Sequence, residues 1–98
     1  MPNKFAKRVD NNHTQITKEL RECGYNVYST HFVGHGFPDL IVNKSGKNYL
    51  VEIKKDEKAE LTESEITFNS AFFVIVGHSI ETILLDILIY DYFIGLAK

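Results

Sequence analysis

The middle of the chain constrains its fold more than any other part of the sequence. Two largely apolar runs, Leu40–Asn43 and Asn48–Val51, flank a short polar stretch centred on Ser45 and Gly46. Runs rich in β-forming residues on both sides of a glycine-containing turn predict a β-hairpin. Because the turn is short, its centre also fixes which residues of the two strands face each other.

This register brings two acidic residues together. Continued to the open end of the hairpin, it sets Asp39 opposite Glu52, with Cβ atoms roughly 5 Å apart. Lys54 points to the same side as Glu52, because side chains along a strand repeat with a period of two. Two carboxylates this close repel each other unless one is protonated or a cation lies between them. The hairpin therefore predicts a site for a hard divalent cation.

An ordinary surface hairpin is the alternative interpretation of the same residues. In that case Asp39 and Glu52 form a cross-strand acidic pair, and Lys54 is only a salt-bridge partner. Single Asp and Glu-x-Lys patterns arise often by chance, so a motif of this kind remains a hypothesis. The coincidence of register and flanking apolar strands favours the cation site.

The N-terminal half predicts one helix followed by a strand before the hairpin. Apolar residues at helical spacing indicate a helix over 12–23, with Gly24 as its stop and with Asp10 and Asn12 as capping residues. Residues 25–32 alternate and are rich in β-forming types, which predicts a strand.

After the hairpin the sequence predicts a helix, a strand and a final helix. Thr62 and Glu65 form a capping-box pattern that opens the first of these helices. The short apolar run 72–76 predicts a buried strand. Ser79 is the expected N-cap of the last helix, which covers 79–96. Glu65 is interpreted as the capping partner and not as a catalytic acid.

The last helix is apolar on nearly every side, which a one-sided surface helix is not. A chain this short has too little protein of its own to cover such a helix, so we expect a second copy of the chain to cover it. Glu81, Asp86 and Asp91 interrupt the apolar run and make membrane insertion costly. We therefore expect a homodimer and no membrane association.

Composition and length set the class of protein. The 98 residues make one domain, and a hydrophobic fraction of 44% is typical of a globular chain. The lone Cys23 cannot form an intrachain disulfide. With no signal peptide and no spanning segment in the sequence, we expect a cytoplasmic protein. The net charge of −2 does not indicate nucleic-acid binding, but residues 1–9 form a basic arm.

Several motifs resemble those of the PD-(D/E)XK nuclease superfamily, in particular its virus-type replication-repair nuclease (VRR-NUC) branch. The resemblance covers roughly residues 8–88 and rests on four segments: Arg8-Val9-Asp10-Asn11-Asn12, Gly36-Phe37-Pro38-Asp39, Glu52-Ile53-Lys54 and Leu61-Thr62-Glu63-Ser64-Glu65. Two positions depart from the family pattern. Gln15 stands where the first helix often carries a carboxylate, and Glu65 stands where a glutamine often follows the Leu-Thr pair.

The resemblance implies an α/β fold: a restriction-endonuclease-like mixed β-sheet flanked by helices, in the order α-β-β-β-α-β-α. Asp39 and Glu52, with the Ile53 carbonyl, would hold Mg²⁺ or Mn²⁺. Lys54 would orient the attacking water or offset phosphate charge, and Gln15 would hydrogen-bond a metal-bound water or remain an ordinary surface residue. The expected DNA contacts are Lys7, Arg8, Lys55 and Lys58.

The function expected from these features is metal-dependent endonucleolytic cleavage of branched DNA, such as Holliday junctions, in phage or mobile-element replication, recombination or repair. A homodimer would present two sites related by twofold symmetry, which suits a substrate with two equivalent strands. Two alternatives remain open: a non-catalytic nucleic-acid-binding subunit with the same fold, and an assembly protein that works through its last helix.

Overall fold

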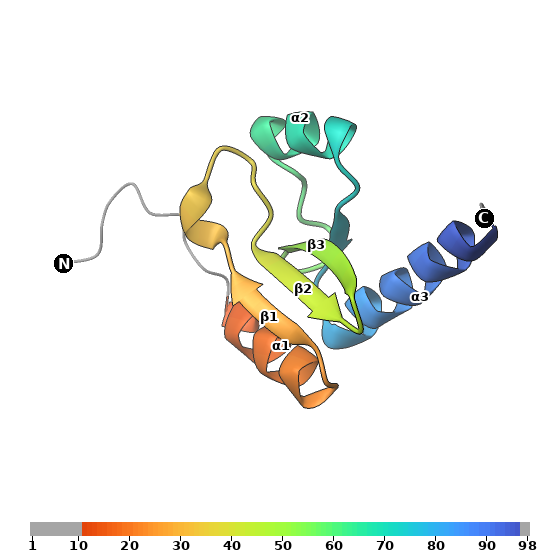
Figure 1. Cartoon of the computed structure of the whole chain (residues 1–98). Helices are drawn as coiled ribbons and strands as arrows, with labels where there is room; N and C mark the ends of the chain where they lie inside the picture. The colour runs from red at the N-terminus through yellow and green to blue at the C-terminus, as the bar shows by residue number, and fades with distance from the viewer. Residues whose placement is uncertain (1–10, 97–98) are drawn as a thin grey trace.

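The computed structural model describes residues 11–96. Its centre is a four-stranded mixed sheet in the order β1-β2-β3-β4, formed by Asn26–Ser29, Leu40–Lys44, Lys47–Ile53 and Ile75–Gly77 (Figure 1). The first three strands pair antiparallel, and β4 pairs parallel to β3. The predicted basic arm, including Lys7 and Arg8, lies outside the described residues.

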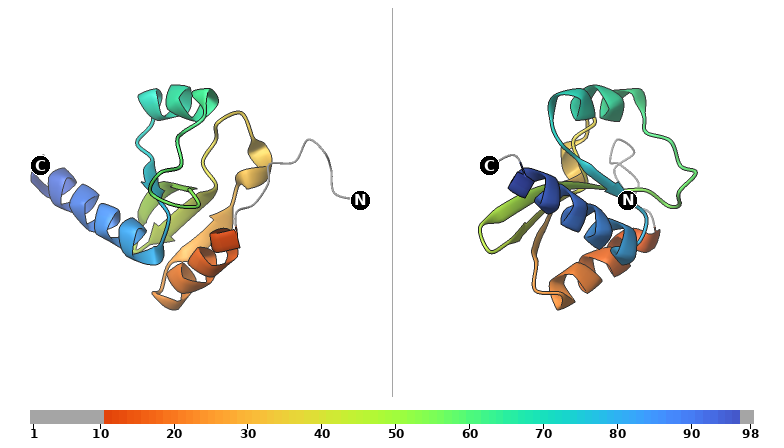
Figure 2. Two further views of the ribbon diagram at one scale, coloured as in Figure 1. Left: turned by 180° about the vertical axis from the view of Figure 1, so that it is seen from behind. Right: turned by 90° about the vertical axis from the view of Figure 1, so that its right-hand side faces the viewer.

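Three α-helices accompany the sheet: α1 (Asn11–Glu22), α2 (Glu63–Ala71) and α3 (Ile80–Leu96). α1 contacts β1 and α3 contacts β4, and the two helices also contact each other. They therefore share one side of the sheet, while α2 lies beyond the ends of the strands (Figure 2). The fold class and the order α-β-β-β-α-β-α predicted from the sequence are confirmed.

The hairpin of β2 and β3 has the predicted register. Ser45 and Gly46 both have positive φ angles, of 54° and 81°, as a two-residue type I′ turn requires. Ile41 pairs with Leu50, and the pairing continues along the strands to Leu40 with Val51. The next facing positions along this register are Asp39 and Glu52.

The hydrophobic core lies between the sheet and the two helices that share its covered face. Val42 and Val51 of the hairpin are fully buried against this side, whereas Tyr28 on the other face of β1 is 66% exposed. Side chains from α1, the hairpin, β4 and α3 complete the core, including Ile16, Leu20, Leu40, Ile53, Ile75, Ile83 and Ile87. The sheet is thus anchored on one face, and its strand ends are left available on the side of α2.

The strand predicted over 25–32 is too long. β1 ends at Ser29, which pairs with Leu40, and the chain then forms a short 3₁₀ helix over His31–Val33. The cause lies in the partner strand, because Pro38 has no N–H to continue the ladder. The last backbone hydrogen bond at this end of the β1–β2 pair is made by Thr30, whose N–H donates to the Asp39 carbonyl at 2.7 Å.

The strand predicted over 72–76 is displaced toward the C-terminus. β4 starts at Ile75, and Phe72 and Phe73 are more than half exposed. The N–H of Phe72 still donates to the Phe68 carbonyl, so this residue ends α2. Phe73 stacks on Tyr90 of α3, with ring centroids 4.2 Å apart. These aromatic side chains pair locally and do not enter the core.

Helix α3 is most deeply buried near its N-terminus. The Ser79 Oγ accepts the Thr82 N–H at 3.2 Å, which confirms Ser79 as the N-cap. Ile80, Ile83 and Ile87 are buried, Tyr90 packs against the core, and Asp91 accepts the Tyr49 hydroxyl at 2.9 Å. The helix then extends from the sheet (Figure 1), and its exposed apolar side chains are Leu85, Leu88, Ile89, Tyr92, Phe93, Ile94 and Leu96. No helix within residues 11–96 is both long enough and apolar enough to cross a bilayer.

Candidate active site

Asp39 is the residue immediately before β2, and its side chain is directed at β3. The residue is 4% exposed, and its Oδ2 accepts the N–H of Ile53 at 2.9 Å. This contact fixes the Asp39 carboxylate beside the backbone of the strand that carries the second acidic residue. The cross-strand proximity predicted from the register is therefore present in the structure.

Glu52 and Lys54 lie on β3 and directly after it, next to this contact. Glu52 is 2% exposed, a degree of burial that glutamate rarely reaches unless it is paired. The Lys54 ammonium is 3.9 Å from Oε2 of Glu52, and its side chain is only 14% exposed. Thus the end of the hairpin gathers Asp39, Glu52 and Lys54 into one largely desolvated cluster.

Glu65 from α2 joins this cluster, which the sequence interpretation did not include. The predicted capping box with Thr62 is confirmed. The same Oε1 atom that accepts the Thr62 N–H at 2.8 Å also accepts Lys54 Nζ at 2.6 Å. Glu65 is therefore both the cap of α2 and an ion-pair partner of Lys54. The sequence feature that could have indicated this role is the position of Glu65 in the family motif, where glutamine is frequent.

The electrostatics of Glu65 follow from these contacts. Burial alone raises the pKa of Glu65, but hydrogen bonds with Glu52, Lys54 and the Thr62 amide, together with the Lys54 charge, outweigh burial and lower its pKa to about 2. Glu65 is thus ionised at neutral pH. The Lys54 ammonium lies beside both carboxyl groups, 2.6 Å from Glu65 and 3.9 Å from Glu52, and so offsets their negative charge.

Asn12 connects α1 to the same end of the sheet. Its Nδ2 donates to the backbone carbonyls of Lys54 and His78, at 2.8 and 3.0 Å. The prediction that Asn12 caps the first helix is wrong, because α1 starts at Asn11 and the amide is used as this bridge. The bridge joins residues far apart in the chain, a relation that local sequence patterns do not reveal.

The loop before Asp39 packs closely on the start of α2. Gly36 has a φ of 82°, and a Cβ at this position would collide with the Ser64 carbonyl. Phe37 and Phe68 meet edge to face, with ring centroids 5.3 Å apart. Glycine is therefore required here for both conformation and space. The contact holds the element that carries Glu65 against the segment that carries Asp39.

The remaining predicted residues lie outside the cluster. Gln15 is exposed on α1, and its expected role at the metal-bound water stays a prediction. Lys55 and Lys58 are exposed in the loop that follows β3. Their expected contacts with DNA stay predictions.

No protein-family model and no curated protein sequence matches the chain. A solved structure described as a VRR_NUC domain does match, with a TM-score of 0.61 and 26% sequence identity. The match covers 81% of this chain and 90% of the matched one. The chain is a structural relative of the VRR-NUC domain. The resemblance inferred from the motifs is thus supported by the fold, which is that of a nuclease domain family.

Nuclease domains of the PD-(D/E)XK type generally use divalent metal ions. In the described part of this VRR-NUC-like chain, no three His, Cys, Asp or Glu side chains form a ready-made metal cage. The donor set still fits Mg²⁺, which binds through one or two carboxylates and keeps several waters. Asp39 and Glu52 are the residues that would supply two hard oxygen ligands, and the Ile53 carbonyl is the predicted third.

Proposed function

We propose that this chain is a metal-dependent endonuclease that hydrolyses phosphodiester bonds in branched DNA. The observation that carries the proposal is the convergence of Asp39, Glu52 and Lys54 at the open end of one hairpin, where both carboxylates are nearly excluded from water. Asp39 accepts the Ile53 N–H and Glu52 lies near the Lys54 ammonium, and a bound divalent ion would offset the remaining cost of desolvating two carboxylates.

Each residue of the cluster has a distinct role in this proposal. Asp39 and Glu52 would hold Mg²⁺ or Mn²⁺, and the bound ion would acidify a water and stabilise charge on the phosphate. Lys54 is a hydrogen-bond donor held close to Glu52, where it orients the attacking water or offsets developing negative charge. Water adds to phosphorus, the phosphorus–oxygen ester bond breaks, and a proton passes to the leaving oxygen.

The exposed surface of α3 supports a homodimer. Seven large apolar side chains are exposed along 85–96, and contiguous apolar surface of this kind on a soluble chain usually marks an interface. A second copy would place an identical surface opposite it, as a twofold interface requires. Two sites in such a dimer suit a junction with two equivalent strands, which is why Holliday junctions are the preferred substrate class.

An assembly protein is the second candidate function, and the same α3 surface favours it. A non-catalytic DNA-binding subunit is a third, since it would keep the fold without using the carboxylates. Neither rival needs a divalent ion. Calorimetric titration with Mg²⁺ and Mn²⁺ separates them from the nuclease, because only the nuclease is expected to lose ion binding when Asp39 is changed to Asn.

The deciding experiment is a cleavage screen with purified protein on linear, flap and four-way DNA, with Mg²⁺ or Mn²⁺ and with EDTA as the control. We expect cleavage of branched DNA that depends on the ion and disappears in Asp39→Asn. Absence of ion-dependent cleavage on every substrate would refute the proposal. Equal cleavage of linear and branched DNA would refute the branched-substrate preference alone.

A further inference from the structure

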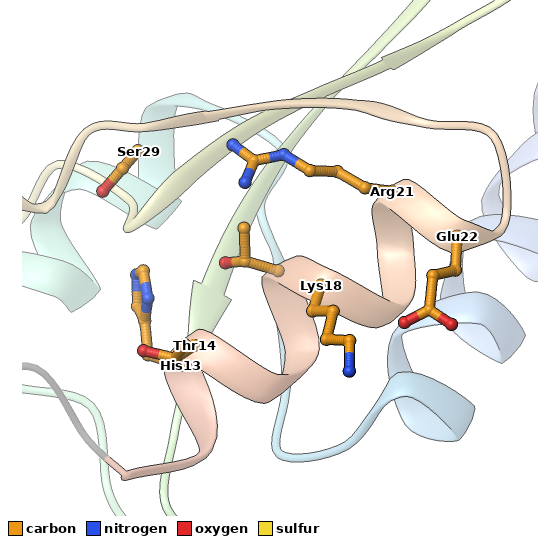
Figure 3. Close-up of a pocket in the computed structure, with 7 residues that line it drawn as sticks. His13, Thr14, Lys18, Arg21, Glu22 and Ser29 are labelled. Carbon is orange, nitrogen blue, oxygen red and sulfur yellow. The ribbon is translucent and has the colours of Figure 1, made fainter.

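The groove between α1 and β1 is a second recess in the surface, separate from the carboxylate cluster. It is lined by side chains that can donate hydrogen bonds, namely His13, Thr14, Thr17, Lys18, Arg21 and Ser29. Figure 3 shows Arg21 extending from α1 alongside β1, while His13 rises from the other end of the helix toward Ser29. The groove is therefore open along the helix and bounded by donors at both ends.

The helical contributors share one face of α1. Thr14, Thr17, Lys18 and Arg21 recur at intervals of three and four residues, which places them in one row along the groove. From Thr14 to Arg21 the row is about 10 Å long at 1.5 Å per residue.

The charge of the groove differs from that of the whole chain. Lys18 and Arg21 oppose a single acidic residue, Glu22, whereas the complete chain carries a net charge of −2. Hydroxyl, imidazole, ammonium and guanidinium groups are the usual partners of phosphate oxygens in DNA complexes. Arg21 donates to the Val27 carbonyl at 2.9 Å, and its remaining N–H groups and the Lys18 ammonium can donate to an anionic ligand.

One end of the groove adjoins the candidate active site. Asn12, directly before His13, donates to the Lys54 carbonyl. On the other wall, Thr30 follows Ser29 and donates its N–H to the Asp39 carbonyl at 2.7 Å. Both walls are thus hydrogen-bonded to the backbone of residues that form the cluster.

His13 and His31 lie where the groove approaches the candidate active site. The rings of His13 and His31 meet edge to face, with centroids 5.6 Å apart. Nδ1 of His31 lies 2.7 Å from the Ser29 hydroxyl oxygen, within hydrogen-bond distance. The two rings therefore extend the row of polar groups from α1 to the segment that precedes Asp39.

We propose that the α1–β1 groove binds the sugar–phosphate backbone of the DNA strand that enters the Asp39–Glu52 site. The inference deepens the proposed function and rests on it for the nature of the ligand. In this proposal the DNA strand runs along α1, away from the α3 surface that is expected to form the dimer. Contacts of this kind position DNA without reading its sequence.

The test measures DNA binding in EDTA, so that its readout does not depend on cleavage. Lys18→Gln removes one positive charge from the groove. Lys47→Gln removes one from the start of β3, where the side chain is 63% exposed and lies 3.6 Å from Asp91. We expect Lys18→Gln to weaken binding several-fold and to reduce the slope of log affinity against log salt by about one. Lys47→Gln should bind like the wild type, and Lys18→Glu should bind more weakly than Lys18→Gln.

Melting temperatures of all variants establish that each is folded. Equal affinities and salt slopes for Lys18→Gln and Lys47→Gln would overturn the groove assignment, even if the wild type cleaves DNA. An absence of wild-type binding would overturn it as well. If binding depends on Lys18 but the wild type cleaves no DNA with any ion, the proposed nuclease function fails and the groove assignment stands.

Discussion

The ammonium nitrogen of Lys54 lies 2.6 Å from Oε1 of Glu65, so the lysine of the Glu-x-Lys motif is held by a helix and not only by its own strand. A lysine side chain has many rotamers, and fixing it before substrate binds removes part of the entropic cost of reaction. Glu65 therefore holds the Lys54 ammonium in place, and both residues can be tested separately from the carboxylates.

Changing Lys54 to Ala should lower turnover by about 10² to 10³-fold, the usual cost of removing one donor aimed at developing charge. Binding of Mg²⁺ or Mn²⁺ should persist, because the ammonium is not a metal ligand. Single-turnover cleavage and calorimetry on the same preparation measure the two quantities. Loss of ion binding together with activity would show that Lys54 is structural.

Acid stability should report the environment of Glu65. Its pKa of about 2 lies below the ordinary value of 4.5, so its ionised form stabilises the folded chain above pH 4.5. That contribution is lost as pH falls from 4.5 toward 2. The melting temperature of Glu65→Gln should therefore fall less steeply than that of the wild type across this window. Glutamine preserves the capping box, and parallel curves would contradict the assigned contacts.

Asp39→Asn and Glu52→Gln should each reduce cleavage by about 10³-fold or more, because loss of a metal ligand removes several kcal/mol of transition-state stabilisation. The amide introduced by Asp39→Asn keeps an oxygen that can accept the Ile53 N–H, so the fold should survive. Cleavage assays, with circular dichroism as the control for folding, measure both effects. Near-normal turnover in either variant would mean that the carboxylates do not form the active site.

Gly36→Ala should destabilise the chain by about 1–3 kcal/mol or more, because alanine is strained at a φ of 82° and its Cβ collides with the Ser64 carbonyl. Gly46→Ala is the matched control, since its φ is 81° and no described atom lies within 4 Å of the added Cβ. Urea denaturation compares the two variants. Equal losses would mean that backbone strain, and not packing on α2, accounts for the effect.

Ile89→Glu should convert the expected dimer to a monomer, because it places a charge on the exposed part of α3, where Ile89 is 45% exposed. Cleavage of symmetric junctions should fall more than cleavage of flaps. Ile66→Glu, on the exposed side of α2, is the control. Light scattering at micromolar concentration gives the mass, and a wild-type mass near one 11.2 kDa chain would end the dimer hypothesis.

Local chemistry made part of this structure predictable. The turn at Ser45 and Gly46 fixed the hairpin register, and Thr62 and Ser79 marked the starts of two helices through side-chain caps. The same register predicted the proximity of Asp39 and Glu52. Such features depend on a few neighbouring residues, so they can be read without knowing the rest of the fold.

Features that depend on distant parts of the chain were missed. The bridge from Asn12 to the Lys54 carbonyl and the pairing of Lys54 with Glu65 join different elements. The end of β1 at Ser29 depended on Pro38 of the partner strand, although His31 and Phe32 still carried strand propensity. Intrinsic β propensity gives way when the neighbouring strand offers no hydrogen-bonding partner.

The tight turn at Ser45 and Gly46 fixes the register of the hairpin, so the face on which each carboxylate lies depends on the number of residues between it and the turn. One residue inserted into a single arm of the hairpin would turn one carboxylate to the opposite face of the sheet and separate it from its partner. Removing two residues from each arm would shorten the hairpin and leave both carboxylates facing the same side. In related sequences that keep the site, the two arms of the hairpin should therefore change in length together. A single-residue insertion in one arm should be found only in sequences that have lost the Asp39–Glu52 pair.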